Sequence, residues 1–185
     1  MKEEIESLKE NDVYELTDLP NGKHAFRCIW VYENGKEKKC NAQLVAKGFT
    51  QKFGPDYDEV SSPIAKHVTI RAFLTWAVHT KAKVFQFEVK TVFLHGRLND
   101  EELYMRQPEG FEDEDKVCNL KKSIYGFKQA AKCWNEELEN TLKSYGFTQS
   151  KADSFLFTKG KSEKTMHLIL YVDDILISSK DEDDK

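Results

Sequence analysis

The sequence lacks an uninterrupted apolar run of the roughly 18 residues that a membrane-spanning helix requires. Its most apolar segment, Leu168 to Ile177, is interrupted by two aspartates. No apolar segment of the kind found in a secretory signal peptide follows the first residues, Met1-Lys2-Glu3-Glu4. We therefore expect a soluble protein of the cytoplasm or nucleus that has no membrane partner.

The cysteines lack the spacing of a metal site. No two of them form a CxxC pair, and no Cys/His set has the spacing of a zinc site. We interpret them as free thiols that are buried or half-buried, which is the usual state of free cysteine. They are Cys28, Cys40, Cys118 and Cys133.

The net charge of −4 gives no sign of a nucleic-acid-binding protein, but the charges are unevenly distributed. Residues 36–52 hold five lysines against one acid, and residues 116–132 hold five lysines and no acid. These two segments could together form one surface that faces phosphates. Alternatively, the lysines only solvate exposed faces, and charge alone favours this second interpretation.

Apolar periodicity and turn residues divide the chain into helices and strands. Helical spacing occurs in residues 2–10, 66–80 and 130–145, the last ending before Gly146. Strands are predicted over residues 26–33, about 38–46, 84–89, 103–106, 117–120, 154–158, 167–171 and 175–178. Asn34-Gly35 signals a hairpin, and residues 11–23 are predicted to be a loop. Helices and strands mix without a regular βαβ rhythm, so the predicted fold class is α+β.

Two adjacent carboxylates, Asp173 and Asp174, stand between two apolar strands. The simplest structure is a hairpin that carries both acids at its tip. Such a tip can bind Mg²⁺, a hard ion that takes oxygen ligands and keeps waters and substrate phosphates. The alternative is an ordinary hairpin with a solvated turn, since aspartate is a favoured turn residue.

Glu88 is the candidate for a further carboxylate. Two Mg²⁺ ions about 3.5–4 Å apart need bridging ligands from more than one part of the chain. Glu88 ends a predicted strand and is followed by a turn, which could present backbone N–H groups to phosphates. Alternatively, Glu88 is a solvated acid at the end of a strand.

A series of short motifs runs through nearly the whole chain. They are Glu6 to Leu8 with Tyr14 to Leu16 and Asp18 to Pro20, Trp30-Val31, Leu44 to Gln51, Asp56 to Glu59 with Ser62-Pro63, Glu88 to Gly96, Leu103 to Met105 with Gln107 to Phe111, Ser123 to Gln129, and Tyr171 to Asp174. In this order, they resemble the reverse transcriptase of copia-type LTR retrotransposons, the RNA-directed DNA polymerase domain of a Pol polyprotein.

This resemblance implies a right-hand polymerase fold. We expect residues 1–185 to form a reverse transcriptase domain fragment with fingers and palm, in which helices back an antiparallel palm sheet. Residues up to about 80 would be mainly fingers. Residues from about 81 would be mainly palm, with a fingers insertion around 100–130.

The resemblance also implies a site for two-metal nucleotidyl transfer from a dNTP to a primer 3′-hydroxyl on an RNA or DNA template. Asp173 would bind metal with Asp174 supporting it, Glu88 would bind both ions, and the carbonyl of Val89 would complete the shell. The ions would be Mg²⁺, with Mn²⁺ as a substitute.

Further residues would bind the nucleotide. Phe93 would lie under its sugar and exclude a ribose 2′-hydroxyl, although it could equally be a core phenylalanine. Gln129 would contact the nucleotide and template region, and Lys47 would approach the triphosphate or template.

The chain departs from the family pattern at several positions. The family usually has aspartate where Glu88 stands, and a misplacement on the order of 1 Å can cost about a hundredfold in rate. Asn41 and Gln43 replace a usual lysine and arginine, so two cationic contacts to phosphate would be lost. Val92, His95 and Ala131 also differ from the usual residues.

The chain ends shortly after Asp174. We therefore expect the thumb and any RNase H domain to be absent, and primer-template to be held weakly. The favoured hypothesis is a reverse transcriptase domain, truncated and catalytically impaired. The alternative is a non-catalytic retrotransposon remnant, or a domesticated fragment that binds nucleic acid or protein. A third hypothesis, an unrelated Mg²⁺ phosphotransferase, does not explain the ordered motifs.

Overall fold

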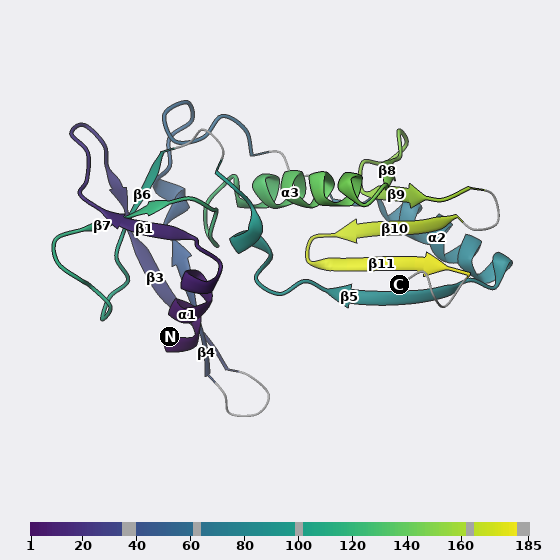
Figure 1. The fold of residues 1–185 in the computed structure, drawn as a ribbon, viewed down its shortest axis with the longest axis horizontal. Helices are drawn as coiled ribbons and strands as arrows, with labels where there is room; N and C mark the ends of the chain where they lie inside the picture. Colours follow the sequence, from purple (N-terminus) through teal and green to yellow (C-terminus); the bar gives the residue numbers. More distant parts are fainter. Residues whose placement is uncertain (35–39, 61–63, 99–101, 162–164, 181–185) are drawn as a thin grey trace. The chain divides into compact units, whose positions relative to one another are not determined.

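The computed structural model of the chain describes residues 1–34, 40–60, 64–98, 102–161 and 165–180 (Figure 1). The helices in these segments are α1 (Lys2–Glu10), α2 (His67–Thr80) and α3 (Ala130–Ser144), with the short 3₁₀ helices η1 (Gly48–Thr50) and η2 (Val92–His95). The strands are β1 (Tyr14–Thr17), β2 (Ala25–Phe26), β3 (Cys28–Asn34), β4 (Cys40–Ala46), β5 (Lys83–Glu88), β6 (Leu103–Arg106), β7 (Val117–Leu120), β8 (Thr148–Gln149), β9 (Leu156–Lys159), β10 (Met166–Tyr171) and β11 (Asp174–Ser179). This mixture of helices and strands confirms the α+β class. No helix in those segments reaches the length and apolarity that crossing a membrane requires.

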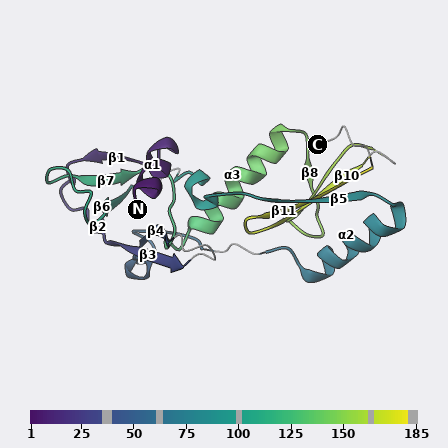
Figure 2. The same cartoon turned by 90° about the horizontal axis from the view of Figure 1, so that it is seen from below.

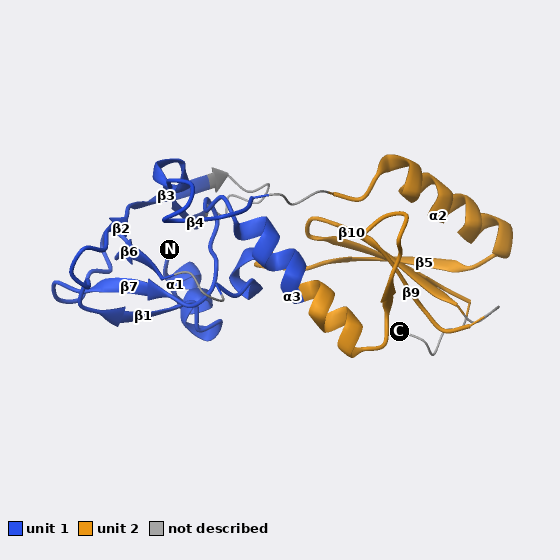
Figure 3. Cartoon of the chain, turned by 90° about the horizontal axis from the view of Figure 1, so that it is seen from above, with its two compact units in different colours: residues 1–61, 93–137 blue, residues 62–92, 138–185 orange. Residues whose placement is uncertain are grey.

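The chain divides into two compact units (Figure 3). Unit 1 contains Met1–Ser61 and Phe93–Glu137, and unit 2 contains Ser62–Val92 and Leu138–Lys185. The helix α3 contributes residues to both units. Each unit is therefore built from two stretches of chain that are far apart in the sequence.

Unit 1 is built on a four-stranded sheet in the order β1-β7-β6-β2 and a β3–β4 hairpin. The strand β2 runs parallel to β6, and the other neighbours are antiparallel. Buried residues from the sheet, from the loop after α1 and from the segment after β7 form one core, which includes Val13, Phe26, Met105, Cys118 and Ile124. The helix α1 adds Ile5 and Leu8 to it, as its predicted apolar face requires.

Unit 2 is built on a five-stranded antiparallel sheet in the order β5-β11-β10-β9-β8. The three consecutive residues Leu168, Ile169 and Leu170 of β10 are all buried, so both faces of this central strand are covered. The helix α2 lies on one side of the sheet (Figure 2). Burial on both faces explains why the sequence of β10 shows an apolar run rather than alternation.

The long helix α3 ends as the sequence predicts. Gly146 has a φ of +83°, its N–H donates to the carbonyl of Lys143, and the N–H of Phe147 donates to the carbonyl of Leu142. These two hydrogen bonds define a Schellman motif, in which glycine adopts the left-handed conformation without a Cβ clash.

Several predicted boundaries were wrong. Residues 11–23 were expected to be a loop but contain β1, which pairs with β7. The short strand β8 was not expected, and the predicted strand 26–33 is two strands, β2 and β3, separated at Arg27. The predicted strand 154–158 begins at Leu156, because the carboxylate of Asp153 accepts the N–H of Phe155 and holds a turn there.

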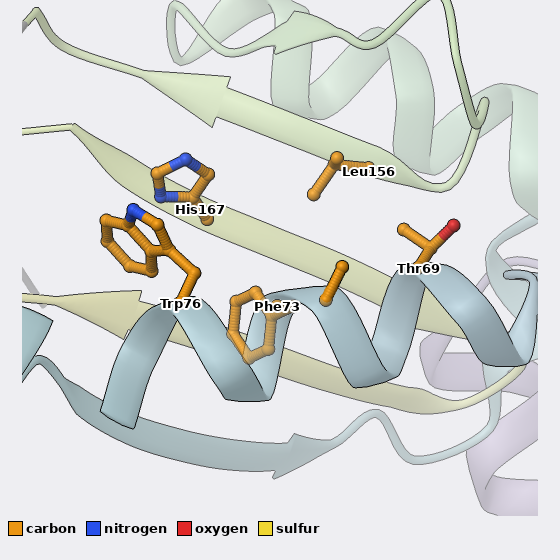
Figure 4. A pocket seen from close by; sticks show the side chains of 6 residues that line it. Thr69, Phe73, Trp76, Leu156 and His167 are labelled. Carbon is orange, nitrogen blue, oxygen red and sulfur yellow. The ribbon is translucent and has the colours of Figure 1, made fainter. Parts of the chain in front are cut away.

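A pocket of about 220 Å³ lies between α2 and the sheet of unit 2 (Figure 4). The helix contributes Thr69, Phe73 and Trp76, and the strands contribute Leu156 and His167. The rings of Trp76 and His167 lie 4.1 Å apart. The Nδ1 atom of His167 is buried and has no hydrogen-bond partner among the described residues. Burial lowers the pKa of His167 below its ordinary value of 6.5.

We predict that His167→Phe makes unit 2 less sensitive to acid. The lowered pKa means that below pH ~6.5 the unfolded chain binds a proton that the folded chain does not, so wild-type stability falls as pH decreases. Phenylalanine keeps the contact with Trp76 and removes that proton. Urea unfolding at about pH 7.5 and pH 5.5 should show that His167→Phe loses less stability than wild type between the two pH values. A variant at the exposed His79, His79→Gln, should behave as wild type.

The start of α2 is tied to Asp153. Its carboxylate accepts hydrogen bonds from the Thr69 hydroxyl at 2.5 Å, the Lys66 N–H at 3.0 Å and the Phe155 N–H at 3.0 Å. Burial acts to raise the pKa of Asp153, but these hydrogen bonds outweigh it and hold the pKa below its ordinary value of 3.8. The carboxylate therefore stabilises the fold above that pH.

We predict that Asp153→Ala destabilises the protein by about 3 kcal/mol, because it removes the acceptor of one buried and two partly buried hydrogen bonds. The wild-type contribution is fully present above the ordinary aspartate pKa and is lost as pH falls through the lowered folded value. Urea unfolding at neutral pH and near pH ~3 measures both effects. Asp18→Ala, at an exposed position, is the control. An equal loss of stability in Asp153→Ala and Asp18→Ala would contradict the prediction.

Candidate functional site

The hairpin tip predicted from the sequence is present between β10 and β11. Tyr171 pairs with Asp174, so Val172 and Asp173 form a two-residue turn. Val172 has a φ of +59°, and positive φ at only the first central residue matches a type II′ turn. This conformation is strained for a β-branched residue, and such strain is concentrated at functional sites.

The strand pairing brings the predicted third carboxylate to this tip. The strands β5 and β11 lie side by side (Figure 1). Glu88, the last residue of β5, pairs with Asp174 of β11. Residues directly opposite each other in antiparallel strands point to the same face, with Cβ atoms about 4.5–5.5 Å apart. The N–H of Val89 donates to the carbonyl of Asp173 at 2.8 Å, which extends the pairing to the turn.

A fourth residue, which the sequence interpretation missed, holds one of these carboxylates. The Nε2 atom of Gln86 donates to Oδ1 of Asp174 at 2.9 Å. Gln86 stands two residues before Glu88, so both side chains lie on one face of β5. The period of two within the strand could have identified Gln86, but its partner depends on the register between β5 and β11.

The donor set fits a hard divalent cation in its chemistry. In the part of the chain that the structure describes, no three His, Cys, Asp or Glu side chains converge closely enough to hold a metal ion. Mg²⁺ in phosphoryl-transfer sites is usually bound through one or two carboxylates, with the remaining positions taken by waters and phosphates. Glu88 and Asp174 on one sheet face, with Asp173 in the adjoining turn, provide such carboxylates.

The other predicted site residues lie in unit 1. Phe93, in η2, is half-buried and packs against the core of that unit. Its ring lies 5.0 Å from the ring of Tyr125 in an edge-to-face arrangement. The alternatives for Phe93, a sugar contact or a core residue, both remain. Lys47 is half-buried, and its N–H donates to the carbonyl of Arg27 at 2.8 Å.

Gln129 is engaged within the protein, with only 1% of its surface exposed. Its Oε1 atom accepts a hydrogen bond from Gln51 at 2.9 Å, and its Nε2 donates to the carbonyl of Asp56 at 3.2 Å. The N–H of Lys128 donates to Oε1 of Gln51 at 2.9 Å. We call Gln51, Asp56 and Gln129 the buried amide network. The contact of Gln129 with a nucleotide stays a prediction.

Two of the sequence motifs meet at this network. The N–H of Ala46 donates to the carbonyl of Tyr125 at 2.8 Å. A Cβ atom on Gly48 would overlap the carbonyl oxygen of Gly126, and one on Gly126, whose φ is +94°, would overlap the carbonyl oxygen of Ala46. The segments Leu44 to Gln51 and Ser123 to Gln129 are therefore joined by backbone contacts that only glycine permits.

The structure describes only some of the side chains that depart from the family pattern. Gln43 lies in β4 opposite Val31 and is half-buried. The side chain of Asn41 and the lysines of residues 36–39 lie outside the described residues, as does the side chain of Cys40.

The other cysteines confirm the prediction of free thiols. Cys118 is buried, and Cys28 and Cys133 are half-buried. Burial raises the pKa of Cys28 to about 11 and that of Cys118 to about 12. Both thiols therefore stay protonated at neutral pH and are poor nucleophiles.

Comparison with known proteins places this fold in a family. Residues 11–184 match the family described as reverse transcriptase (RNA-dependent DNA polymerase). The chain is 45% identical over 190 residues to the retrovirus-related Pol polyprotein from transposon TNT 1-94 of Nicotiana tabacum, covering 98% of the chain and 14% of that protein. It is 37% identical over 190 residues to the Pol polyprotein from transposon RE1 of Arabidopsis thaliana, covering 98% of the chain and 13% of that protein.

The motifs and these similarities thus place the chain in a class of polymerases. The chain belongs to the reverse transcriptase family, and its resemblance to the copia-type retrotransposon enzymes is confirmed. It spans about one seventh of the length of the tobacco relative. A more distant relative, the transposon Ty1-DR5 Gag-Pol polyprotein of Saccharomyces cerevisiae, is 28% identical over 162 residues, which cover 86% of the chain and 9% of that protein.

We predict that Gln129→Met destabilises the protein by about 2 kcal/mol. It keeps the side-chain volume but removes the hydrogen bonds of Gln129 to the amide of Gln51 and to the carbonyl of Asp56, which leaves these two groups only the long 3.5 Å bond to each other. Gln43→Met, at a half-buried strand position, should change stability by less than about 0.5 kcal/mol. Urea unfolding of both variants tests this. Equal stabilities would mean that the buried amide network contributes nothing to the fold.

Proposed function

We propose that this chain is the RNA-directed DNA polymerase domain of a copia-type retrotransposon. It would join a deoxynucleotide to a primer 3′-hydroxyl on an RNA or DNA template. Family membership supports the reaction class. The observation that carries the assignment of the site is the register of β5 with β11, which sets Glu88 opposite Asp174 and next to the strained turn at Val172.

The carboxylates of Glu88, Asp173 and Asp174, with the carbonyl of Val89, would hold two Mg²⁺ or Mn²⁺ ions. When bound, such ions lower the pKa of the attacking hydroxyl and neutralise charge on the transferring phosphoryl group. Gln86 would keep the Asp174 carboxylate oriented through its 2.9 Å hydrogen bond. A carboxylate that is already oriented loses less conformational entropy when its ligand arrives.

In this proposal the antiparallel sheet of unit 2 is the palm, and unit 1 supplies the fingers. The helix α2 belongs to the same unit as this sheet. Lys47 would approach the triphosphate or template from the fingers. Phe93 would contact the nucleotide sugar, and the Tyr125 ring packed edge-on against it would limit its movement.

Catalysis would be slow because of the side chain at position 88. Glutamate is one methylene longer than the aspartate usual in the family, so its carboxylate extends further beyond the strand. Mg²⁺ demands near-ideal octahedral geometry, and a misplacement on the order of 1 Å costs about a hundredfold in rate. We therefore propose a polymerase domain whose catalytic rate is limited by the position of the Glu88 carboxylate.

The test is primer extension on an RNA template with Mg²⁺ or Mn²⁺. We expect slow dNTP incorporation by the wild-type chain, an increase of about 10- to 100-fold in Glu88→Asp, and no incorporation in Asp173→Asn. Glu10→Asp makes the same change at an exposed position of α1 and should leave the rate unchanged.

The outcomes separate the proposal from the alternative of a non-catalytic remnant. Incorporation that disappears in Asp173→Asn rules out the remnant. No incorporation by wild type, with activity restored by Glu88→Asp together with an added thumb, identifies a decayed polymerase. Incorporation that persists in Asp173→Asn contradicts the assigned site.

A further inference from the structure

The loop of residues 48–57 in unit 1, which we call the aromatic loop, exposes two large rings. Phe49 is 78% exposed and Phe53 is 72% exposed. Burying a phenylalanine side chain is worth about 1.5–3 kcal/mol relative to leaving it in water. Two such rings on one short loop are therefore an uncommon arrangement, and larger exposed apolar patches often mark binding surfaces.

The ring of Phe53 begins a row of contacts that ends in a cation. The ring of Phe53 lies 5.8 Å from that of Tyr57 in an edge-to-face arrangement. The Nζ atom of Lys128 lies 4.7 Å from the centre of the Tyr57 ring and donates to its hydroxyl at 3.2 Å. An aromatic surface and a positive charge are thus presented side by side.

Hydrogen bonds to the buried amide network hold the aromatic loop in place. Gln51 and Asp56 are each 4% exposed. The carboxylate of Asp56 accepts the N–H of Lys52 at 2.6 Å, and the N–H of Gly54 donates to the carbonyl of Tyr57 at 3.0 Å. Gln51 and Asp56 are in turn bonded to Gln129. A loop that is already ordered costs less conformational entropy when it binds a ligand.

The aromatic loop is accompanied by exposed cations. Lys52 in the loop and Lys128 are exposed, and Lys47, directly before the loop, is half-buried. Asp56 is buried, and its Oδ1 atom lies 3.6 Å from Nε2 of His24. The acids that follow the loop, Asp58 and Glu59, are exposed, and Glu59 pairs with Lys132 at 3.1 Å.

Exposed rings, neighbouring cations and a preformed backbone are the features with which proteins bind single-stranded nucleic acid. Unpaired bases stack on the rings, and lysines contact the phosphates. Bases within a duplex already stack on one another, so their faces are not available to a side chain. The chemistry of this surface therefore favours an unpaired strand over a duplex.

We propose that the aromatic loop binds unpaired bases of a single nucleic-acid strand, with Phe53 as the stacking surface and Lys52 and Lys128 as phosphate contacts. Only the identity of that strand as a template rests on the proposed polymerase function. The buried amide network acts as a positioning element for the rings.

The test compares two probes of equal length and charge, a short oligothymidine and the same strand with abasic sites, by fluorescence anisotropy. Stacking is worth about 1–3 kcal/mol per base, so wild type should bind the abasic strand about tenfold more weakly. Phe53→Ala should weaken oligothymidine binding by a similar factor and remove the difference between the probes. Tyr145→Ala, at a ring of unit 2 that is 67% exposed, is the matched control and should bind as wild type.

Further variants separate the parts of the surface. Lys52→Gln and Lys128→Gln should reduce the dependence of the dissociation constant on salt and keep the preference for bases over abasic sites. Gln129→Met should reduce that preference although Gln129 is only 1% exposed, and hydrogen exchange of residues 51–57 should become faster in this variant. A purely structural role of Gln129 would lower stability and leave the preference unchanged.

The proposal is overturned if wild type binds both probes equally, or if Phe53→Ala retains the preference. It is also overturned if Phe53→Ala instead abolishes self-association seen by sedimentation, because the rings would then contact a second copy of the chain. Asp173→Asn should bind oligothymidine as wild type. A failure of primer extension with intact strand binding thus counts against the polymerase proposal alone, and the reverse result counts against the aromatic loop alone.

Discussion

The register between β5 and β11 is the constraint on which the candidate site depends. It sets Glu88 opposite Asp174 and leaves the Val89 N–H to bond the carbonyl of Asp173. A slip of one residue would move Glu88 to the other face of the sheet, since side chains alternate along a strand. The continuous ladder between the two strands, which runs from Asp174 opposite Glu88 to Ser179 opposite Lys83, fixes the register. The pairing of β5 with β11 thus determines which carboxylates can act together.

In unit 1, the exposed aromatic loop is held in one conformation. This loop of residues 48–57 has little secondary structure of its own, apart from η1. The loop is ordered by the buried amide network, in which the side-chain amides of Gln51 and Gln129 bond each other and Gln129 bonds the backbone of Asp56. A fully bonded polar network in a buried place specifies one arrangement, whereas an apolar contact tolerates several. The defined positions of Phe53 and Tyr57 follow from this network.

Local sequence patterns predicted the features that depend on neighbouring residues. The turn at Val172 and Asp173 follows from two apolar strands that flank two acids, and the end of α3 follows from Gly146. Features that depend on distant partners were not predictable. The strand β1 forms in a segment without apolar alternation because β7 supplies its hydrogen bonds. The hydrogen bond of Gln86 and the burial of Gln129 likewise depend on register and packing, which no local pattern encodes.

The contact between Gly48 and Gly126 has a consequence for the history of such chains. A side chain of any size at either position would collide with the opposite backbone, so the first substitution there separates two motifs that are distant in the sequence. Mobile elements leave many copies in a genome, and copies released from selection change at every position alike. The state of these two glycines across sibling copies is therefore a simple genetic record of which copies still encode a protein able to fold.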